Sequence, residues 1–494
     1  MNVLYHNDVT LRERVAECLQ DDFKHKAIET AQEVFYAKRG ALVEEMGEGW
    51  QELRLRATEI RNHVTENLDY YVKLFAENAE ANGYIMHYAP TDQDALADVI
   101  DIFEKHQAQT TVKSKSMMTE EVGLNEVLEE AGYTVVETDC AECILQKAES
   151  KPSHIVVPAL HFDRDAICDI FTEKCGYEGT SVPEELTHFL RRYLRPEFLN
   201  ADIGIRGCNF AVAATGSPTL ITNEGNGRMV DSVPKVQIIF VGIDRIVPDL
   251  QSLDVMEALV PRSAVGSKMT AYFSVDSGPA HADEVDGPVE AHIILMDNGR
   301  SRILKTEFEP MFRCMRCGAC LNICPVYRHI TGHGYGSIYP GPMGVVMTPN
   351  LVGYDEIDTM VFACSLCGAC SDHCPATIPL HDLIRAHRIE IVDEGKNHSN
   401  EVPVFKLLRK MWSDVGFYKF AMSAGGPMMR LFADSSKGAL TVNSTWMPVV
   451  KGWTSTRDFD VLSKDRFRTW FKNHKPLAAE TPVQENQGTE GGDA

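Results

Sequence analysis

The chain has 494 residues, of which 44% are apolar and 24% are charged, a composition that is ordinary for a soluble globular protein. This length exceeds a single compact core and predicts three or more structural units. The formal net charge of −23 argues against a nucleic-acid-binding protein, which needs basic patches to replace the counterions of phosphate groups.

The predicted elements begin with helices. Residues 10–82 carry apolar side chains at three- and four-residue spacing. This pattern predicts a helical N-terminal region, 1–82, that ends at Gly83.

From residue 83 onward, strand-like and helix-like segments alternate. The strand-like segments are YIMHYA (84–89), TTVKSKS (110–116), TVVETD (134–139) and HIVVPAL (154–160), the last an apolar run typical of a strand covered on both faces. Helices are predicted from Thr91, over TEEVGLNEVLEEAG (119–132), and near 162–175 and 183–195; the β-rich stretches IGIRGCNFAVAA, TLITNEG and KVQIIFVGI follow. This βαβα order predicts an α/β central domain, 83–300, with a mostly parallel sheet.

Beyond residue 300 the sequence changes character twice. Residues 301–385 are rich in short loops, glycine, proline and cysteine and predict a separate ferredoxin-like module. Residues 386–475 predict a helical C-terminal region, in which Pro403 opens the helix VFKLLRKMWSDVGFYKF. The polar, glycine-rich stretch 476–494 predicts a disordered tail.

The helix after Pro403 is amphipathic. Its basic and apolar faces are formed by Lys406, Arg409 and Lys410 and by Leu407, Leu408 and Trp412. We interpret it mainly as a domain-packing helix, with contact to a partner subunit or peripheral contact to a membrane surface as alternatives.

The sequence carries no sign of export or of membrane insertion. No basic segment followed by an apolar stretch opens the chain, and no uncharged apolar run of about 18 residues occurs. We therefore expect neither a secretory signal nor a transmembrane segment, and we expect a cytoplasmic location. The 14 cysteines should then stay reduced and available as metal ligands.

Two cysteine runs, CMRCGACLNICP (314–325) and CSLCGACSDHCP (364–375), share the form C-x₂-C-x₂-C-x₃-C-P. The two-residue spacing wraps the backbone into a tight coil that places three sulfurs at corners of a cubane-sized object and turns N–H groups toward them. Permissive or turn-forming residues stand where the coil needs them: Gly318, Gly368, Pro325 and Pro375. The pattern predicts two [4Fe–4S] clusters. Structural zinc is the alternative, but zinc usually takes two C-x₂-C pairs per site and needs neither the third cysteine nor the proline.

In bacterial two-cluster ferredoxins, the fourth cysteine of each run serves the cluster of the other run. Carried over to this chain, the first cluster takes Cys314, Cys317, Cys320 and Cys374. The second cluster takes Cys364, Cys367, Cys370 and Cys324. Because cysteine fills every ligand position, no iron is open to a substrate, so the clusters are predicted to carry electrons rather than to do bond chemistry. Arg316, inside the first run, should raise the potential of the nearer cluster.

Several segments outside the cysteines resemble one bacterial family. RCMRCGACLNICPVYRHITGHGYGSIYPGPMGVVMTP and SLCGACSDHCPATIPLHDL are similar to the iron–sulfur subunit of the bacterial L-lactate utilisation system, the LutB/LldF family. So are VKSKSMMTEEVGLNEVLEEAGYTVVETD, PSHIVVPALH, ATGSPTLITNEGNGR and PKVQIIFVGIDRIVP. The resemblance covers about residues 20–475.

This resemblance implies a central domain with the fold of the CoA-transferase and ribose-phosphate isomerase group. It implies a non-catalytic electron-transfer subunit of a complex that oxidises L-lactate to pyruvate and passes electrons through two [4Fe–4S] clusters to a downstream acceptor. The implied partners are a subunit with CCG motifs, like those of heterodisulfide reductase, and a smaller subunit with a related central domain. Two other functions stay open: a catalytic subunit that binds a 2-hydroxy acid in the α/β domain, and a scaffold with structural clusters.

The C-x₂-C pair Cys140 and Cys143 stands at the expected end of a strand and departs from the family pattern TDLGEYI. We interpret both residues, and Cys18, Cys168, Cys175 and Cys208, as free buried cysteines. Of the histidines in the insert between the cysteine runs, we expect His329 and His333 to pack rather than to relay protons.

Polar residues at predicted strand ends and turns could form a ligand site in the central domain. Lys113 and Lys115 follow a strand, and Glu224 and Arg228 stand in the glycine-rich turn NEGNGR. Ligands of α/β sheets favour the carboxyl ends of strands, so these residues could bind a small anion. A solvated turn is the alternative and is the interpretation we favour.

Overall fold

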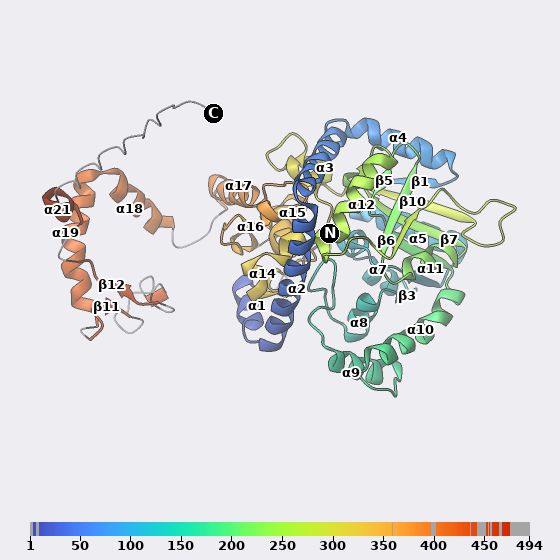
Figure 1. Ribbon diagram of the computed structural model, residues 1–494, viewed down its shortest axis with the longest axis horizontal. Coiled ribbons are helices and arrows are strands. Elements are labelled where there is room, and N and C mark those ends of the chain that lie inside the picture. Colours follow the sequence, from blue (N-terminus) through green and yellow to red (C-terminus); the bar gives the residue numbers. More distant parts are fainter. Residues whose placement is uncertain are drawn as a thin grey trace, which may run out of the picture. The chain divides into compact units, whose positions relative to one another are not determined.

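A computed structural model describes residues 3–5, 9–357, 359–396, 402–434, 436–441, 451–452, 454, 457–463 and 467–474 (Figure 1). The chain forms two compact units, Met1–Lys396 and Asn397–Ala494. The predicted boundaries at residues 82, 300 and 385 all fall inside the first unit, and these subdivisions stay predictions. The predicted disordered tail, 476–494, lies outside the described residues.

The N-terminal region is helical, as predicted. Its helices are α1 (Leu11–Cys18), α2 (Asp22–Met46), α3 (Glu48–Glu66) and α4 (Leu68–Ala81). Helix α1 starts with a capping box, in which the Thr10 hydroxyl accepts from the N–H of Glu13 and the Glu13 carboxylate accepts from the N–H of Thr10. Gly47 separates α2 from α3 with a φ of 55°, a left-handed backbone value that favours glycine.

A six-stranded sheet forms the centre of the first unit, and all its strand pairs are parallel. In spatial order the strands are β1 (Ile85–Ala89), β10 (Glu290–Met296), β7 (Val236–Gly242), β4 (Ile203–Gly207), β2 (Thr110–Lys113) and β3 (Thr134–Glu137). Every residue of β7 is buried, which explains the continuous apolar run in KVQIIFVGI. The predicted parallel α/β fold is confirmed.

Helices cover both faces of this sheet. Alternate residues of β7 enter two different cores: Ile238 and Phe240 pack on the side of α5, whereas Ile239 and Val241 pack on the side of α4. The helices of this domain are α5 (Asp92–His106), α6 (Met117–Val122), α7 (Leu124–Glu130), α8 (Cys140–Ala148), α9 (Arg164–Cys175), α10 (Pro183–Asn200), α11 (Asn226–Ser232) and α12 (Leu250–Ala264). Helix α4 contacts β1, at one edge of the sheet, and α10 contacts β2, near the other edge (Figure 1).

A second, four-stranded sheet lies in the same domain. Its order is β8 (Ile246–Val247), β5 (Ala211–Val212), β6 (Ser217–Thr222) and β9 (Tyr272–Val275). It is a mixed sheet, since β5 pairs parallel with β8 and antiparallel with β6.

The predicted strand HIVVPAL (154–160) is wrong. These residues form bends and turns, and the Nδ1 atom of His154 accepts hydrogen bonds from the N–H groups of Val156 and Val157, each at 3.1 Å. The side chain thus takes backbone donors that a strand would give to its neighbours, so an apolar run here marks a buried loop rather than a strand.

Two further segments also differ from prediction. The helix expected over 119–132 is divided by Gly123, whose φ of 67° ends α6 before α7 begins. The segment at Cys140 begins helix α8 instead of ending a strand, because the Asp139 carboxylate caps the N–H groups of Ala141 and Glu142.

The cysteine-rich segment consists of short helices and 3₁₀ turns. They are η2 (Arg300–Ile303), η3 (Glu309–Arg313), α13 (Ala319–Asn322), α14 (Pro325–Ile330), η4 (His333–Tyr335), α15 (Gly341–Val352), η5 (Met360–Phe362), α16 (Ala369–His373) and α17 (Leu380–Asp393). Ile28 of α2 and Trp50 of α3 share one core with Leu321 and Tyr327 of this segment. Figure 1 accordingly shows α2 beside α14.

The second unit contains α18 (Val402–Ser413), α19 (Val415–Phe432), β11 (Ala439–Leu440), β12 (Phe459–Asp460) and α21 (Phe467–Asn473). The single helix predicted after Pro403 is interrupted at Asp414, whose carboxylate caps the N–H of Phe417. None of the residues of α18 is buried. Across the described ranges, no helix combines the length and the apolar character that crossing a membrane requires.

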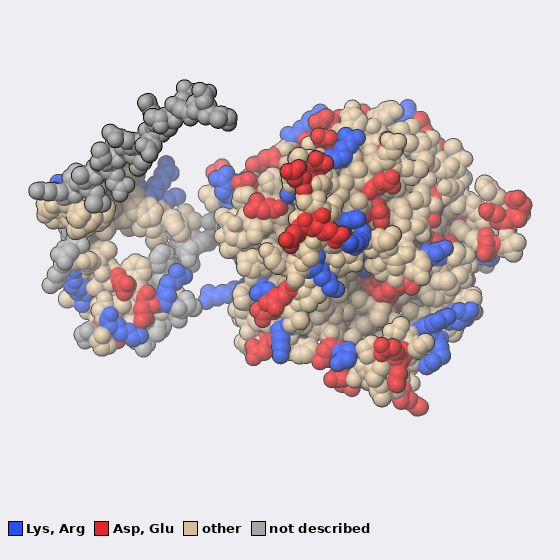
Figure 2. Space-filling view, viewed as in Figure 1, with Lys and Arg blue, Asp and Glu red and all other residues tan. Residues whose placement is uncertain are grey.

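Acidic and basic side chains are mixed on the visible face of the first unit (Figure 2). The acidic excess behind the net charge of −23 is therefore not gathered into one patch on this face.

Candidate metal centre

The two cysteine runs fold in the same way. Arg316 and Leu366, which stand at equivalent positions, both have a φ of 56°, and Gly318 and Gly368 follow with φ values of 76° and 83°. Each glycine then precedes a short helix, α13 or α16, that carries the third cysteine of its run. The repeat in sequence is therefore a repeat in backbone conformation.

The thiols are grouped across the runs. One cavity is lined by Cys314, Cys317, Cys320 and Cys374. Burial raises the pKa of Cys374 to about 11, and the Cys314 thiol contributes to this rise. Burial likewise raises the pKa of Cys324 to about 11, and here the contributing thiol is Cys364. The fourth cysteine of each run thus lies near thiols of the other run.

The surroundings of these thiols fit an iron–sulfur cluster. Burying thiolates is costly unless a cation and hydrogen-bond donors compensate their charge. The N–H of Leu366 donates to the sulfur of Cys364 at 3.3 Å, and the N–H of Tyr327 donates to the sulfur of Cys324 at 3.4 Å. These donors agree with the predicted role of the backbone in the coil.

Arginines surround the cysteine runs, and several come from elements far away in sequence. Arg54 of α3 donates to the carbonyl of Cys374 from Nε at 3.1 Å and from Nη2 at 2.7 Å. Arg245 donates to the carbonyl of Cys314 at 3.3 Å. Neither contact was predicted, because nothing local to these arginines in the sequence indicates a neighbouring cysteine.

Two further arginines lie close to the second cysteine run. Arg39 of α2 donates to the carbonyl of His373 at 2.8 Å and stacks over Trp50 at 5.0 Å. Arg388 of α17 donates to the carbonyl of Cys364 at 2.7 Å. The first run and Cys374 are thus close to more cations than Cys364 is.

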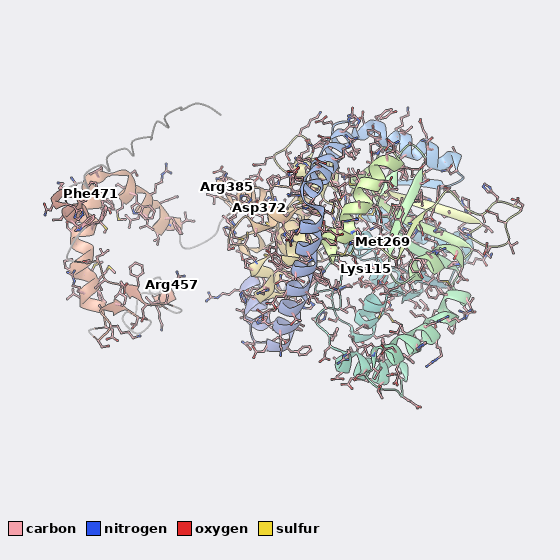
Figure 3. The ribbon with its side chains drawn as sticks, viewed as in Figure 1. Lys115, Met269, Asp372, Arg385, Arg457 and Phe471 are labelled. Carbon is pink, nitrogen blue, oxygen red and sulfur yellow. The ribbon has the colours of Figure 1, made fainter. Side chains whose placement is uncertain are left out.

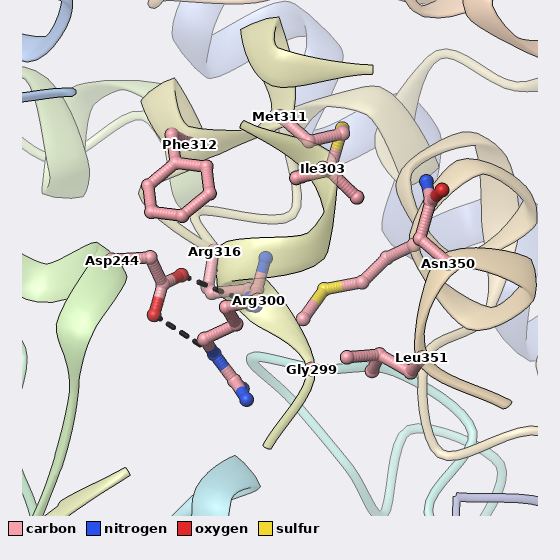
Figure 4. Close-up of a pocket in the computed structure, with 10 residues that line it drawn as sticks. Asp244, Gly299, Arg300, Ile303, Met311, Phe312, Arg316, Asn350 and Leu351 are labelled. Carbon is pink, nitrogen blue, oxygen red and sulfur yellow. Dashed lines mark hydrogen bonds and ion pairs between the residues drawn. The ribbon is translucent and has the colours of Figure 1, made fainter. Parts of the chain in front are cut away.

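Arg316 is held in a buried charge network (Figure 4). Its Nη2 lies 3.4 Å from Asp244 Oδ2, and its guanidinium lies 5.1 Å from the centre of the Tyr339 ring. Arg300 Nε lies 3.1 Å from the other oxygen of Asp244. Burial opposes ionisation of Asp244, but Arg245, Arg300 and Arg316 together hold its pKa well below its usual range.

The cysteines differ in exposure. Cys314, Cys320, Cys324, Cys370 and Cys374 are buried, whereas Cys367 is exposed and Cys364 is half-buried. Phe362, at 45% exposure, and Ile389, at 49%, are exposed large apolar side chains of η5 and α17, next to the second run. The second run is therefore the more accessible one.

The two histidines of the insert and the two cysteines of the C-x₂-C pair lie in packed surroundings. His333 lies 2.8 Å from the carbonyl of Lys151 and packs edge-on against the ring of His161, and His329 packs against His25. Cys143 is buried in the core between α8 and its neighbours, and Cys140 is partly buried beside it. These contacts agree with the packing interpretation of all four residues.

The four polar residues at the strand ends separate into two groups. Lys113 is fully buried, with Nζ 2.6 Å from Glu137 and 3.0 Å from Glu120. Arg228 stacks over the ring of Tyr272 at 5.5 Å. In contrast, Lys115 and Glu224 line the same cavity, which has a volume of about 320 Å³ and lies at the carboxyl ends of β2, β3 and β4.

Two family profiles match separate parts of the chain. The LUD domain matches residues 72–296, and a 4Fe-4S dicluster domain matches residues 310–378. The first match covers the parallel sheet, and the second covers both cysteine runs.

Among curated proteins, Lactate utilization protein B 2 of Bacillus mycoides (strain KBAB4) is 46% identical over 464 residues, which is 94% of this chain and 97% of that protein. Lactate utilization protein B of Bacillus thuringiensis (strain Al Hakam) has the same identity and coverage. A solved DUF162 family protein from Deinococcus radiodurans is 14% identical with a TM-score of 0.27, covering 46% of this chain and 98% of that chain, and carries no argument at this level of similarity.

Proposed function

This chain belongs to the lactate utilization protein B family, and from that membership we propose that it is the iron–sulfur electron-transfer subunit of a multi-subunit complex that oxidises L-lactate to pyruvate. The observation that carries the proposal is the pair of matching coils, each with the fourth cysteine of the other run beside its thiols.

The proposed ligands of the first [4Fe–4S] cluster are Cys314, Cys317, Cys320 and Cys374. The proposed ligands of the second are Cys364, Cys367, Cys370 and Cys324. When bound, such clusters accept and release single electrons. Because a cysteine is assigned to each iron, the chain itself contributes charge, burial and positioning rather than a group that attacks substrate.

The arginines around the thiols support different electronic roles for the two clusters. Arg54, Arg245 and Arg316 place positive charge near the first run and Cys374, the proposed ligands of the first cluster, where it favours the reduced state. The exposed Cys367 makes the second cluster the natural point of exchange with a partner. We propose that electrons leave there for a downstream acceptor.

The proposed partners are a subunit with CCG motifs and a smaller subunit with a related central domain. The proposed regions of this chain are 1–82, 83–300, 301–385 and 386–475. The proposed location is the cytoplasm, with peripheral contact to a membrane through the helix after Pro403 as a variant of that proposal; in the described chain all 14 cysteines are free, which is compatible with a reducing compartment.

The test uses single cysteine variants of the full chain, reconstituted without oxygen. The wild type should bind about eight irons and bleach reversibly with dithionite. Cys374→Ala and Cys317→Ala should lose the same electron-paramagnetic-resonance signal, and Cys324→Ala and Cys367→Ala should lose the other. Cys168→Ala, on α9, is the matched control and should keep both signals.

Other outcomes would identify the competing functions. Zinc in place of iron would reject the clusters, and shared signal loss between Cys374→Ala and Cys367→Ala would reject the crossed ligands. Clusters that cannot be reduced without unfolding would indicate a scaffold. Bleaching of the isolated chain by L-lactate alone would indicate a catalytic subunit.

A further inference from the structure

Two lysines separated by one residue at the end of β2 have opposite electrostatic surroundings. The Nζ of Lys113 lies within ion-pair distance of Glu120 and Glu137. The Nζ of Lys115 donates to the carbonyl of Val156 at 2.6 Å, and among the described residues no carboxylate oxygen lies within ion-pair distance of it. An ammonium group has three N–H donors, so two donors of Lys115 remain available for a ligand.

Lys115 faces a cavity rather than open solvent. The cavity holds about 320 Å³ and is lined by the turns that follow β2, β3 and β4, the turn after β6, the end of α12 and the first cysteine run. Figure 3 labels Lys115 and Met269, two residues that line this cavity. This is the place where α/β sheets bind ligands, outside the carboxyl ends of their strands.

Other polar groups in the cavity wall also lack protein partners. Ser114 is 4% exposed, and its hydroxyl has no hydrogen-bond partner among the described residues. The side-chain carbonyl of Asn209 accepts from Ile221, and that of Asn223 accepts from Ala271, which leaves their amide N–H groups as donors. Ser114 is a buried polar group without a partner, which is costly, and the two asparagine amides are available as further donors, so this wall suits a polar ligand.

The charges of the wall limit the ligand to a small anion. Arg245 and Arg316, which also line the cavity, are both engaged by Asp244 at 3.5 and 3.4 Å. Lys115 is thus the wall cation whose charge no carboxylate contacts within the described chain. A single such cation suits a monoanion better than a polyphosphate.

We propose that this cavity binds a small monocarboxylate that carries an oxygen on C2, a 2-hydroxy or 2-oxo acid, with its carboxylate on Lys115 and its C2 oxygen toward Glu224. This proposal rests on the proposed function, because it gives the substrate or product of the lactate-oxidising complex a binding site in this chain. A three-carbon acid leaves room in the cavity for ordered water molecules, each of which takes about 30 Å³.

Glu224 is suited to contact the C2 oxygen. One of its oxygens accepts from the N–H of Cys140 at 2.9 Å, and the other is free to face the ligand in the described structure. Burial, with Asp139 adding to it, raises the pKa of Glu224 to about 7. Near neutral pH this carboxyl group can therefore either donate to a keto oxygen or accept from a hydroxyl.

The position of the cavity links the ligand to the first cluster site. Met315, Arg316 and Cys317 form part of its wall, so a bound anion lies against the coil of the first run. An added negative charge at that wall disfavours reduction of a neighbouring cluster. Binding should therefore be visible in the potential of one cluster.

Calorimetric titration of the oxygen-free, reconstituted full chain tests the proposal. L-lactate and pyruvate are the two ligand arms, and propionate, which lacks the C2 oxygen, is the control ligand. Lys115→Met should weaken binding by about tenfold or more, because it removes a charge-assisted contact. Lys268→Met, which removes a surface lysine that pairs with Glu45, is the control variant and should bind like the wild type.

A second measurement uses the wild-type chain, so its result does not depend on whether a variant folds. Pyruvate, but not propionate, should lower one of the two midpoint potentials of the wild type and leave the other unchanged. Glu224→Gln should reduce the preference for pyruvate over propionate.

The proposal is overturned if the chain with both clusters reducible by dithionite binds neither acid, if Lys115→Met binds them as tightly as the wild type, or if propionate binds equally well. Each of these results leaves the electron-transfer function intact. A chain without reducible clusters would instead reject that function.

Discussion

Arg54 on helix α3 donates two hydrogen bonds to the carbonyl of Cys374, although 320 positions separate the two residues in the sequence. The contact places a guanidinium beside the last cysteine of the second run. It also ties the N-terminal helices to the cysteine-rich segment.

Removal of this cation should make one cluster harder to reduce. In Arg54→Gln, we expect a midpoint potential lowered by tens of millivolts, since about 59 mV corresponds to a tenfold change for one electron. Loss of the paired hydrogen bonds should also cost about 1.5–3 kcal/mol of stability. Redox titration followed by electron paramagnetic resonance measures the first effect, and thermal unfolding measures the second.

Arg56→Gln is the matched control for Arg54. Arg56 lies on the same helix but is exposed and pairs with Glu59. Equal shifts in the two variants would show that the effect of Arg54 is general electrostatics and not its contact with Cys374.

Arg316 should raise the potential of the first cluster, as the sequence predicts. Leu366 occupies the same position in the second run with the same φ of 56°, so Arg316→Leu exchanges the charge without new backbone strain. We expect one potential to fall and the other to stay constant in redox titration. Two unchanged potentials would contradict the role assigned to Arg316.

The two coil glycines should differ in their tolerance of a methyl group. An added Cβ at Gly318 would lie 3.1 Å from the His154 ring and 3.2 Å from Val156, whereas at Gly368 the nearest atom is 4.0 Å away. Both positions have positive φ, which costs alanine about 1–2 kcal/mol. Gly318→Ala should lose a further 1–3 kcal/mol, roughly, through overpacking.

Thermal unfolding and iron content of the two variants measure this difference. Gly368→Ala serves as the internal control, because it shares the backbone strain but not the crowding. A Gly368→Ala variant that is the less stable of the two would contradict the packing described around Gly318.

His154 should make the protein sensitive to mild acid. Burial, helped by the charge of Lys115, lowers the pKa of His154 to about 3 in the folded chain. Between this value and an unfolded pKa of about 6.5, the unfolded chain binds more protons, so stability is full above pH 6.5 and falls as the pH decreases. The loss at pH 5 should reach about 2 kcal/mol from this residue.

The change in unfolding temperature between pH 7 and pH 5 measures this effect. His154→Asn keeps an acceptor near the N–H groups of Val156 and Val157 and should show a smaller change than the wild type. His188→Asn replaces an exposed histidine of α10 and should behave like the wild type. A wild-type slope in His154→Asn would contradict the prediction.

Local sequence signals predicted the parts of this molecule that local physics determines. Thr91 was expected to begin a helix, and it caps α5 because its hydroxyl can satisfy a free N–H. KVQIIFVGI was expected to be β-rich, and it forms the strand β7. The spacing of the cysteines likewise foretold two coils, because tight turns depend on neighbouring residues.

The predictions that failed concern residues whose conformation or contacts depend on parts of the chain that are distant in sequence. HIVVPAL has the composition of a strand, but Ile155 lines the cavity next to the first cysteine run and His154 occupies its own backbone donors. Arg39 and Arg54 give no local sign of the thiols near which they lie. Lys115 lacks an ion pair within the described chain because of where the fold places Asp139 and Glu224. The residues next to Lys115 in the sequence do not indicate these positions.

The link between Arg54 and Cys374 has a consequence for biosynthesis. The N-terminal helices leave the ribosome 320 codons before the segment that covers them, an interval of roughly 15–60 s at bacterial elongation rates. During that interval, Ile28 of α2 and Trp50 of α3 lack the cysteine-rich segment with which they share a core. Because the proposed ligands of the first cluster include Cys374, iron delivery to that cluster has to follow the synthesis of this residue.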